Sequence, residues 1–187
     1  MENNNERHQR RSIRLKEYDY SSAGAYFITA VSHQRLNIFG SIRQEIMNLN
    51  PTGKIIDNAW LEIPNHFPYV TLGAYVIMPN HLHGILQIKS GGVRLSSPLH
   101  AAPIRMSPQP IKRQPLGMIV GSFKSAVTKH VHQAGFLIQQ PIWQRNYFEH
   151  VIRDDEDYER IVEYIKVNPL NWELDNENLE KLSPVSK

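Results

Sequence analysis

The stretch from Tyr75 to Ile88 constrains the fold more than any other part of the chain. It consists of two runs of strand-forming residues separated by a short break. Pro79 and Asn80 suit the first and second central positions of a tight turn. The stretch therefore predicts a β-hairpin, with strands over Val70–Met78 and His81–Lys89.

Two histidines lie just past the predicted turn. Side chains two residues apart on a strand point to the same face, so His81 and His83 project together. On the other face, Leu82, Leu86 and Ile88 can contact a core. Two imidazoles at this spacing are half of a site for a divalent metal, whose other ligands come from elsewhere in the chain. A chance polar face on the strand is the alternative interpretation.

The composition limits the class of protein. At 187 residues the chain suits one domain with a real core. It contains no cysteine, which excludes disulfides and thiolate metal sites and fits a reducing cytoplasm. Any metal must therefore bind nitrogen and oxygen ligands. No apolar run approaches the length of a membrane span, and the first residues lack an apolar segment, so we expect neither membrane insertion nor export.

Charge is distributed unevenly along the chain. The formal net charge is +3, yet the interval Ile63–Phe148 contains eight Lys or Arg and no Asp or Glu. Residues 149–187, in contrast, contain eleven acids and five bases. A long basic stretch without acids is suited to a polyanion, because each Lys or Arg near a phosphate can release a counterion. Nucleic acid is the expected partner, and an ordinary solvated basic loop is the alternative.

Hydrophobic spacing predicts the remaining elements. Aromatic and β-branched residues over 25–31 predict a buried strand, and 42–49 is interpreted as a short strand, with a helical turn as the alternative. Asn50 and Pro51 are typical of a helix start, and that helix ends before Pro64. Two later stripes have helical spacing; they are Leu116, Ile119, Val120, Phe123, Val127 and Val131, and then Tyr158, Ile161, Val162 and Ile165.

The order of these elements predicts the fold. Strand, helix, two strands and helix indicate an α+β protein, an antiparallel sheet with helices packed on one face in a ferredoxin-like sandwich. We expect a basic flexible arm over 1–16, a single domain over 17–170 and a C-terminal tail over 171–187. Within the domain, two glycines, five prolines and several serines predict a mobile basic loop over 90–115.

The last predicted helix starts in an acidic first turn, Asp154–Asp157, and runs to Asn168. Tyr164 and Asn168 are four residues apart, so they share the flank of its apolar stripe. A hydroxyl and an amide oxygen are thus placed one turn apart. An amphipathic tyrosine at the margin of the core is the alternative role for Tyr164, and Tyr147 and Tyr158 are rival candidates for a reactive tyrosine.

Three separated motifs occur in a fixed order along the chain. They are Met78-Pro79-Asn80-His81-Leu82-His83-Gly84, Trp143-Gln144-Arg145 continuing to Glu149-His150, and Glu163-Tyr164-Ile165 leading to Asn168-Pro169. Together they resemble the motifs of the REP-associated tyrosine transposases, which belong to the single-tyrosine HUH transposases of the insertion-sequence 200 type. The resemblance extends over nearly the whole chain and implies that 17–170 is a catalytic transposase domain.

The resemblance also implies roles for individual residues. In that family a His-hydrophobe-His pair binds a catalytic divalent metal, and a tyrosine on a later helix attacks a DNA phosphate. His81 and His83 match the pair, and Tyr164 matches the nucleophile. Asn168 matches the polar residue that completes the metal site, where related transposases have glutamine. The implied cofactor is Mg²⁺ or Mn²⁺, although imidazole nitrogen is a better partner for Mn²⁺.

The implied activity is that of a metal-dependent single-stranded DNA endonuclease and strand transferase. A tyrosine with a pKa of about 10 is roughly a thousandth ionised at neutral pH, so its hydroxyl needs help to attack a phosphodiester. A metal can polarise the scissile phosphate and stabilise the developing charge. The expected products are a 5′-phosphotyrosine and a free 3′-OH.

Family members act on single-stranded DNA with short hairpins, so such DNA is the implied partner. Basic residues are candidates for phosphate contacts, and exposed aromatic rings for stacking on bases; the basic candidates are Lys112, Arg113, Lys124, Lys129 and Arg145. His150 lies in a shared motif, where it either contacts DNA or braces the last helix by packing and hydrogen bonding.

Two other functions fit the same residues. One is a nucleic-acid-binding module without catalysis, which the basic stretch would serve equally well. The other is a two-histidine metallohydrolase that uses water and leaves Tyr164 without a role. The resemblance implies a bacterial protein of the cytoplasm, associated with the nucleoid, and leaves both a monomer and a homodimer open.

Overall fold

The computed structural model describes residues 19–90, 113–136, 140–175, 177 and 178. The predicted arm over 1–16 and the segment 91–112 of the predicted loop lie outside the described residues. Among the described residues, no helix combines the length and the apolar character that crossing a membrane requires.

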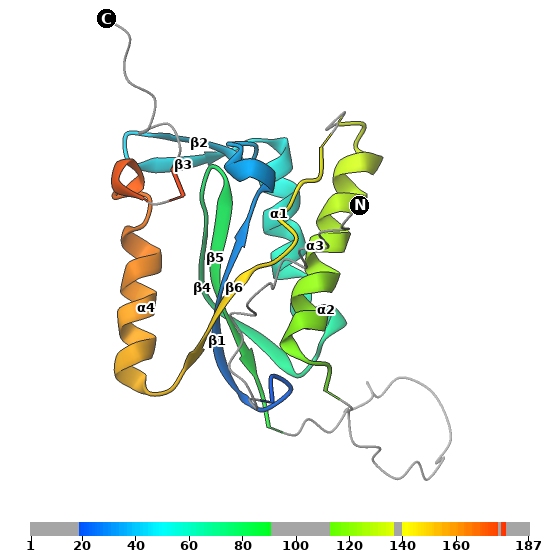
Figure 1. Ribbon diagram of the computed structural model, residues 1–187, viewed down its shortest axis with the longest axis vertical. Helices are drawn as coiled ribbons and strands as arrows, with labels where there is room; N and C mark the ends of the chain where they lie inside the picture. The colour runs from blue at the N-terminus through cyan, green and yellow to red at the C-terminus, as the bar shows by residue number, and fades with distance from the viewer. Residues whose placement is uncertain (1–18, 91–112, 137–139, 176, 179–187) are drawn as a thin grey trace, which may run out of the picture.

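In this part of the chain, four strands form one antiparallel sheet in the order β4-β5-β1-β6 (Figure 1). The strands are β1 (Gly24–Val31), β4 (Val70–Ile77), β5 (His81–Ile88) and β6 (Phe148–Ile152). The helices are α1 (Pro51–Leu61), α2 (Ile63–His66), α3 (Leu116–Gln133) and α4 (Asp155–Val167). A separate hairpin pairs β2 (Gly40–Arg43) with β3 (Ile46–Leu49), and two 3₁₀ turns are η1 (His33–Arg35) and η2 (Trp172–Leu174).

The order β1, α1, β4, β5, α3 and β6 is the βαββαβ order of a ferredoxin-like fold. The predicted α+β class and antiparallel sheet are thereby confirmed. One detail is corrected: α1 and α3 share one face of the sheet, whereas α4 lies on the opposite face (Figure 1). The apolar stripe of α4 needs an apolar surface of its own, and the second face of β1 and β5 supplies it.

The larger core lies between the sheet and the pair α1 and α3. Alternate residues of β1 and β5 point into it, including Ile28, Leu82 and Leu86, each fully buried. All six residues of the predicted α3 stripe are buried, which confirms their helical spacing. From α1, Trp60 packs edge-on against Phe123, with ring centroids 5.4 Å apart.

A smaller apolar cluster joins α4 to the opposite face. It contains Phe27 and Ile85 from the strands and Ile161 and Ile165 from the helix. α4 packs against β4, and residues of β1 and β6 on this face line a pocket. Because the side chains of β5 alternate, its histidines point to this face, beside the small cluster.

The region over 42–49, interpreted as one strand, is a hairpin of β2 and β3. Its turn residues Gln44 and Glu45 have φ angles of 50° and 64°, left-handed values that suit a two-residue hairpin. The predicted helix start is confirmed, since the Gly53 N–H donates to the Asn50 side chain at 2.9 Å. The sequence pattern predicts no strand at the position of β6. This strand has only five residues, and one of them is the charged Glu149, so it is too short to show a clear alternation of apolar and polar side chains.

Replacing Gly84 by alanine tests how closely α1 packs on the sheet. A Cβ at this position would lie 2.4 Å from Cζ2 of the buried Trp60. Overpacking of this kind costs roughly 1–3 kcal/mol. We therefore expect Gly84→Ala to lower the free energy of unfolding by about that amount, measured by urea denaturation.

Gly121→Ala is the matched control, because nothing lies within 4 Å of a Cβ at this exposed position of α3. Alanine is favoured over glycine inside a helix by about 1 kcal/mol, so this variant should be at least as stable as the wild type. Equal stability of Gly84→Ala and the wild type would contradict the close approach of Trp60.

Candidate metal and nucleophile site

His81 and His83 lie side by side on β5, facing the side of the sheet that carries α4. Their exposed fractions are 0% and 4%, and their ring centroids are 4.4 Å apart. Across the sheet they pair with Val31 and Thr29 of β1. The two imidazoles therefore share one face, as their spacing predicts.

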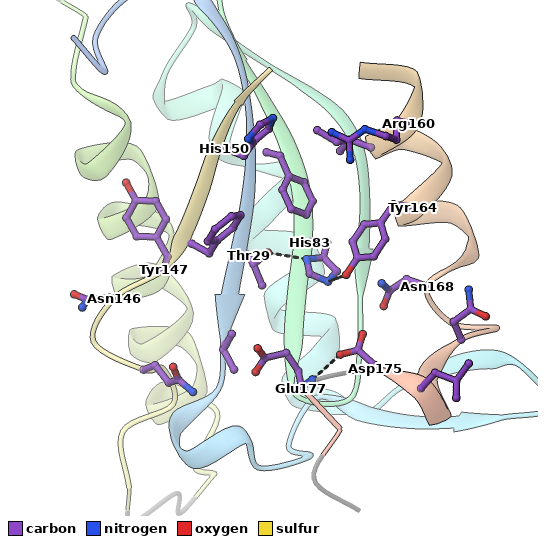
Figure 2. A pocket seen from close by; sticks show the side chains of 17 residues that line it. Thr29, His83, Asn146, Tyr147, His150, Arg160, Tyr164, Asn168, Asp175 and Glu177 are labelled. Carbon is purple, nitrogen blue, oxygen red and sulfur yellow. Dashed lines mark hydrogen bonds between the residues drawn. The ribbon is translucent and has the colours of Figure 1, made fainter. Parts of the chain in front are cut away.

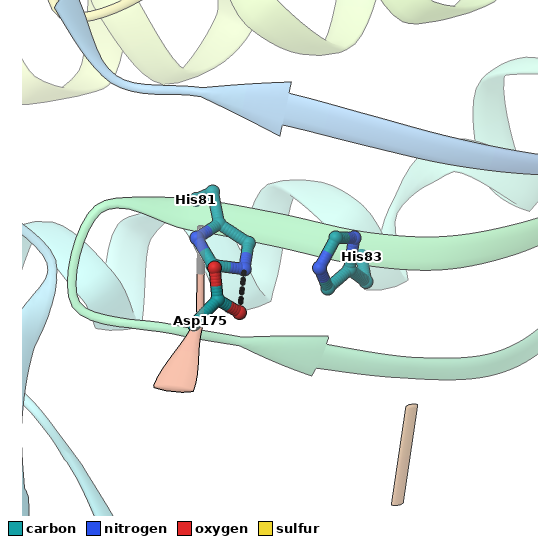
Figure 3. Close-up of side chains that lie close together, drawn as sticks. All are labelled: His81, His83 and Asp175. Atoms are coloured by element: carbon teal, nitrogen blue, oxygen red, sulfur yellow. Dashed lines mark ion pairs between the residues drawn. The ribbon is translucent and has the colours of Figure 1, made fainter. Parts of the chain in front are cut away.

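Hydrogen bonding determines which nitrogen of His81 is available. Its Nδ1 lies 2.8 Å from the Asn80 amide oxygen, an acceptor, so Nδ1 carries the proton and donates. Nε2 then holds a buried lone pair, with no hydrogen-bond partner in the described part of the chain. It faces Asp175, whose Oδ2 lies 3.9 Å away (Figure 3). A cation between this nitrogen and this carboxylate would stabilise both.

His83 is held between β1 and α4. Its Nδ1 lies 2.8 Å from the Thr29 hydroxyl, and its Nε2 lies 3.2 Å from the Tyr164 hydroxyl (Figure 2). With Nδ1 protonated, His83 donates to Thr29 and accepts from Tyr164. The ring also stacks on Phe27, with centroids 5.3 Å apart. Both imidazoles can therefore present Nε2 to the same space.

Burial keeps both imidazoles neutral. It lowers the pKa of His81 to about 4, and it lowers the pKa of His83 well below the ordinary value, with the neighbouring His81 adding to the effect. The contact drawn in Figure 3 thus joins a neutral imidazole to a carboxylate near pH 7. Neutral rings leave their nitrogen lone pairs available to a metal.

Tyr164 approaches the histidines from α4, at the wall of the pocket. The side chain is 45% exposed, and its ring packs edge-on against Phe27 with centroids 6.1 Å apart. Burial raises the pKa of the hydroxyl, hydrogen bonding from Asn168 lowers it, and the charges of Asp175 and Glu177 raise it further. The phenol is therefore protonated at neutral pH. A cation that offset the two carboxylates would favour the phenolate.

Two oxygen donors complete the surroundings of the histidines. Asn168, the C-cap of α4, is 3% exposed, and within the described residues its Oδ1 has no hydrogen-bond partner. Asp175 follows η2, and its carboxylate and one nitrogen of each histidine lie within 4.8 Å of one another. This group could bind a metal, because Nε2 of His81 is buried without a hydrogen-bond partner among the described residues and lies close to a carboxylate and a second imidazole. Imidazole and oxygen ligands together suit a divalent ion such as Mn²⁺.

The sequence pattern does not single out Asp175. It is one of eleven acids over 149–187, and no spacing distinguishes it from the others. Its place near the histidines depends on the chain turning back after α4. Asn80 carries a clearer signal, since it directly precedes His81, but the pattern identifies it as a turn residue rather than as a partner of the imidazole.

The basic residues expected to contact DNA are dispersed over the molecule. Lys112 lies outside the described residues. Arg113 is partly buried, and its guanidinium reaches the Lys89 carbonyl at 3.5 Å. Lys129 and Arg145 are exposed and line a groove of about 480 Å³ beside α3. The groove therefore brings together two of the five predicted cations with their side chains exposed.

Lys124 has a different environment. Its ammonium donates to the carbonyl oxygens of residues 144–146, at 2.6, 3.4 and 3.2 Å in chain order. Burial lowers the pKa of this lysine to about 8. The side chain therefore holds the segment 144–146 against α3, although it also borders the groove.

His150 ties β6 to the start of α4. Its Nε2 lies 2.7 Å from Oδ2 of Asp157, which also contacts the Arg160 guanidinium. Hydrogen bonding from His150 holds the pKa of Asp157 below its ordinary value. This geometry fits the bracing role, although His150 also lines the pocket (Figure 2).

The pocket beside Tyr164 has a volume of about 920 Å³ and is bordered by β1, β6 and α4 (Figure 2). His83 and Asn168 share its wall with Tyr164. Phe148 lies on the β6 side, where it is 45% exposed. Gln144 borders both this pocket and the groove beside α3. The pocket and the groove with the exposed Lys129 and Arg145 are thus neighbours that share Gln144.

The site thus combines a ferredoxin-like sheet, a buried histidine pair and a tyrosine contributed by α4. No family model matches the chain. An uncharacterised protein of Haemophilus influenzae is 43% identical over 171 residues, which are 90% of this chain and 92% of that protein. A second Haemophilus influenzae protein, provisionally named REP-associated tyrosine transposase, is 27% identical over 81% of this chain and 73% of its own.

The REP-associated tyrosine transposase of Escherichia coli is 24% identical over 81% of this chain and 69% of its own. A solved structure of a REP-associated tyrosine transposase bound to a REP hairpin shares the fold, with a TM-score of 0.56 and 19% identity over 85% of this chain and 73% of that chain. Over most of its length the chain is therefore similar to REP-associated tyrosine transposases.

Thermal denaturation with Mn²⁺ tests whether the histidines bind a metal. A ligand that binds only the native state raises the free energy of unfolding by about 2.7 kcal/mol at 100 times its Kd. We expect Mn²⁺ to raise the melting temperature of the wild type relative to EDTA. The variant with both His81→Ala and His83→Ala should show no such shift, because it lacks both nitrogen ligands.

The matched control replaces His130 and His132, which lie in the last turn of α3 and are exposed. This double alanine variant should keep the Mn²⁺-dependent shift. Shifts of equal size in both double variants would place the bound metal away from β5.

Proposed function

We propose that this chain is a metal-dependent single-stranded DNA endonuclease and strand transferase, with Tyr164 as the covalent nucleophile. The observation that carries the proposal is the 3.2 Å distance between the Tyr164 hydroxyl and Nε2 of His83. His83 and His81 belong to the group that could hold a metal, so nucleophile and ion would share one space. Because all three residues come from one chain, a monomer would suffice for cleavage.

The proposed step exchanges one phosphate ester for another. The Tyr164 hydroxyl loses its proton to solvent, its oxygen bonds to phosphorus, and the bond from phosphorus to the 3′ oxygen breaks. That oxygen takes a proton and leaves as a 3′-OH, while the 5′ end stays on the protein as a phosphotyrosine. Attack by another DNA 3′-OH on the same phosphorus would release Tyr164 and join two strands.

Several residues would prepare this step. His81, His83 and Asn168 would hold Mn²⁺ or Mg²⁺, with Mn²⁺ favoured by two imidazole ligands. When bound, the ion supplies positive charge that polarises the scissile phosphate and stabilises the charge that develops there. Phe27 packs edge-on against the Tyr164 ring and so restricts the directions in which the hydroxyl can point.

We infer that the partner is single-stranded DNA with a hairpin, since a structural relative is bound to a REP hairpin. In the pocket, the exposed ring of Phe148 offers a surface on which a base can stack. A strand that leaves the pocket past Gln144 reaches the groove with Lys129 and Arg145. These two cations would contact phosphates and set the path of the strand.

An adduct assay tests the proposed nucleophile. A hairpin-bearing single strand labelled at its 3′ end should give, with Mn²⁺, a labelled protein band that survives denaturant. The same strand labelled at its 5′ end should give a shorter free product with a 3′-OH. Tyr164→Phe should abolish both products, because phenylalanine has no oxygen to attack the phosphate.

Tyr158→Phe is the matched control on the same helix. The Tyr158 hydroxyl contacts the Gln87 amide at 3.2 Å rather than a histidine, so this variant should still form the adduct. An adduct with Tyr164→Phe would refute the nucleophile. Cleavage without any adduct would favour the water mechanism, and tight binding with neither product would identify a binding module.

Salt dependence tests the proposed path of the DNA. Each cation that contacts a phosphate of a single strand contributes about 0.7 to the slope of log K against log salt concentration. Lys129→Ala and Arg145→Ala should each weaken binding and reduce the slope by about that amount, measured by fluorescence anisotropy. Lys89→Ala is the control, because Lys89 follows the end of β5 that is remote from the histidines. Unchanged slopes for the first two variants would place the strand elsewhere.

A further inference from the structure

The η2 turn and the described residues after it lie at one end of the candidate metal site. This C-terminal strap comprises residues 172–175, 177 and 178. It begins with Trp172, which is 8% exposed and whose ring centroid lies 6.1 Å from that of His81. The Glu177 N–H donates to the Asp175 carboxylate at 2.6 Å. The carboxylate is therefore held in place by the backbone of the strap itself.

Asn80 joins the strap to the turn of the β4–β5 hairpin. Its side chain is fully buried. Its amide nitrogen donates to the carbonyl oxygens of Arg35 at 3.0 Å and of Glu177 at 2.7 Å, while its amide oxygen accepts from His81 at 2.8 Å. The Arg35 guanidinium also pairs with the Glu177 carboxylate. Asn80 thus connects His81 to the strap through one accepted and one donated bond, and its second donated bond ties it to Arg35.

This arrangement leaves two buried acceptors facing each other. Because Nδ1 of His81 donates to Asn80, the lone pair of His81 is on Nε2. That atom faces Oδ2 of Asp175 at 3.9 Å. Two buried acceptors in this relation are unfavourable unless a cation or a proton lies between them. A divalent ion would satisfy both atoms at once.

We propose that Asp175 is a metal ligand and that Asn80 is a positioning residue, which directs Nε2 of His81 and the carboxylate of the strap toward one ion. The inference rests on the proposed metal site and extends it beyond residue 170. The ligand is a divalent cation that accepts both nitrogen and oxygen donors. Compared with the amide oxygen of Asn168, the carboxylate of Asp175 adds a negative charge, which strengthens the binding of such an ion.

Direct Mn²⁺ binding to the full chain, without DNA, tests the inference independently of cleavage. Removing an outer partner of a metal ligand lowers metal affinity roughly 10–100-fold. We expect Asn80→Ala to weaken Mn²⁺ binding by about that factor and Asp175→Asn by at least as much. Both affinities are measured by calorimetry at a temperature where circular dichroism shows each variant folded.

Two further variants separate positioning from general stability. Asn80→Asp keeps an acceptor for His81 but loses both donors that hold Arg35 and the strap, so its Mn²⁺ affinity should also fall. Asn48→Ala is the matched control, because Asn48 is exposed in the β2–β3 hairpin and donates only locally, to the Ile46 carbonyl at 3.0 Å. Its Mn²⁺ affinity should equal that of the wild type.

Hydrogen exchange of the wild type gives a test that needs no variant. Mn²⁺ should slow the exchange of backbone amides in the strap as well as in β5. Unchanged Mn²⁺ affinity in folded Asp175→Asn, or protection confined to β5, would overturn the inference. If the inference on Asp175 and Asn80 failed but the wild type still formed the Tyr164 adduct with Mn²⁺, the proposed function would stand. A wild type that binds no Mn²⁺ would overturn both.

Discussion

The burial of two neutral imidazoles on one face of the sheet is the constraint on which the site depends. Each ring has one nitrogen bonded to a neighbour in the sheet or its turn, Thr29 for His83 and Asn80 for His81. Each other nitrogen faces a group contributed from beyond β6, a phenol in one case and a carboxylate in the other. The site is therefore assembled from segments that are far apart in the sequence, and its stability depends on the polar partners of the buried rings.

Strand β5 serves the core and the site at the same time. Its residues on one face, such as Leu82 and Leu86, contact the core beneath α1 and α3, while the alternate residues are the two histidines. A ferredoxin-like unit needs only the first of these faces for stability. Helix α4 is added on the second face, where it covers part of the sheet and brings Tyr164 to His83. The added helix thus places a tyrosine hydroxyl beside the histidine pair of a common fold.

The parts of the fold that short-range periodicity determines could be predicted from the sequence. The period of two on β5 places the histidines together, and the helical stripe of α3 is buried as expected. Tyr164 required a family resemblance in addition, since its spacing alone also fits a tyrosine at the edge of the core. Asp175 and the face chosen by α4 depend on how distant segments pack, which no local pattern encodes. Strand β6 is too short to show an alternation of its own.

Lys124 changes how the basic composition of the central region should be understood. Its ammonium donates to the carbonyl oxygens of residues 144–146. This cation therefore holds that segment against α3. This segment borders both the pocket and the groove, because Gln144 lines each of them. A charge–dipole contact that is partly buried is only weakly screened by salt. The segment 144–146 should therefore keep its position over a wide range of ionic strength.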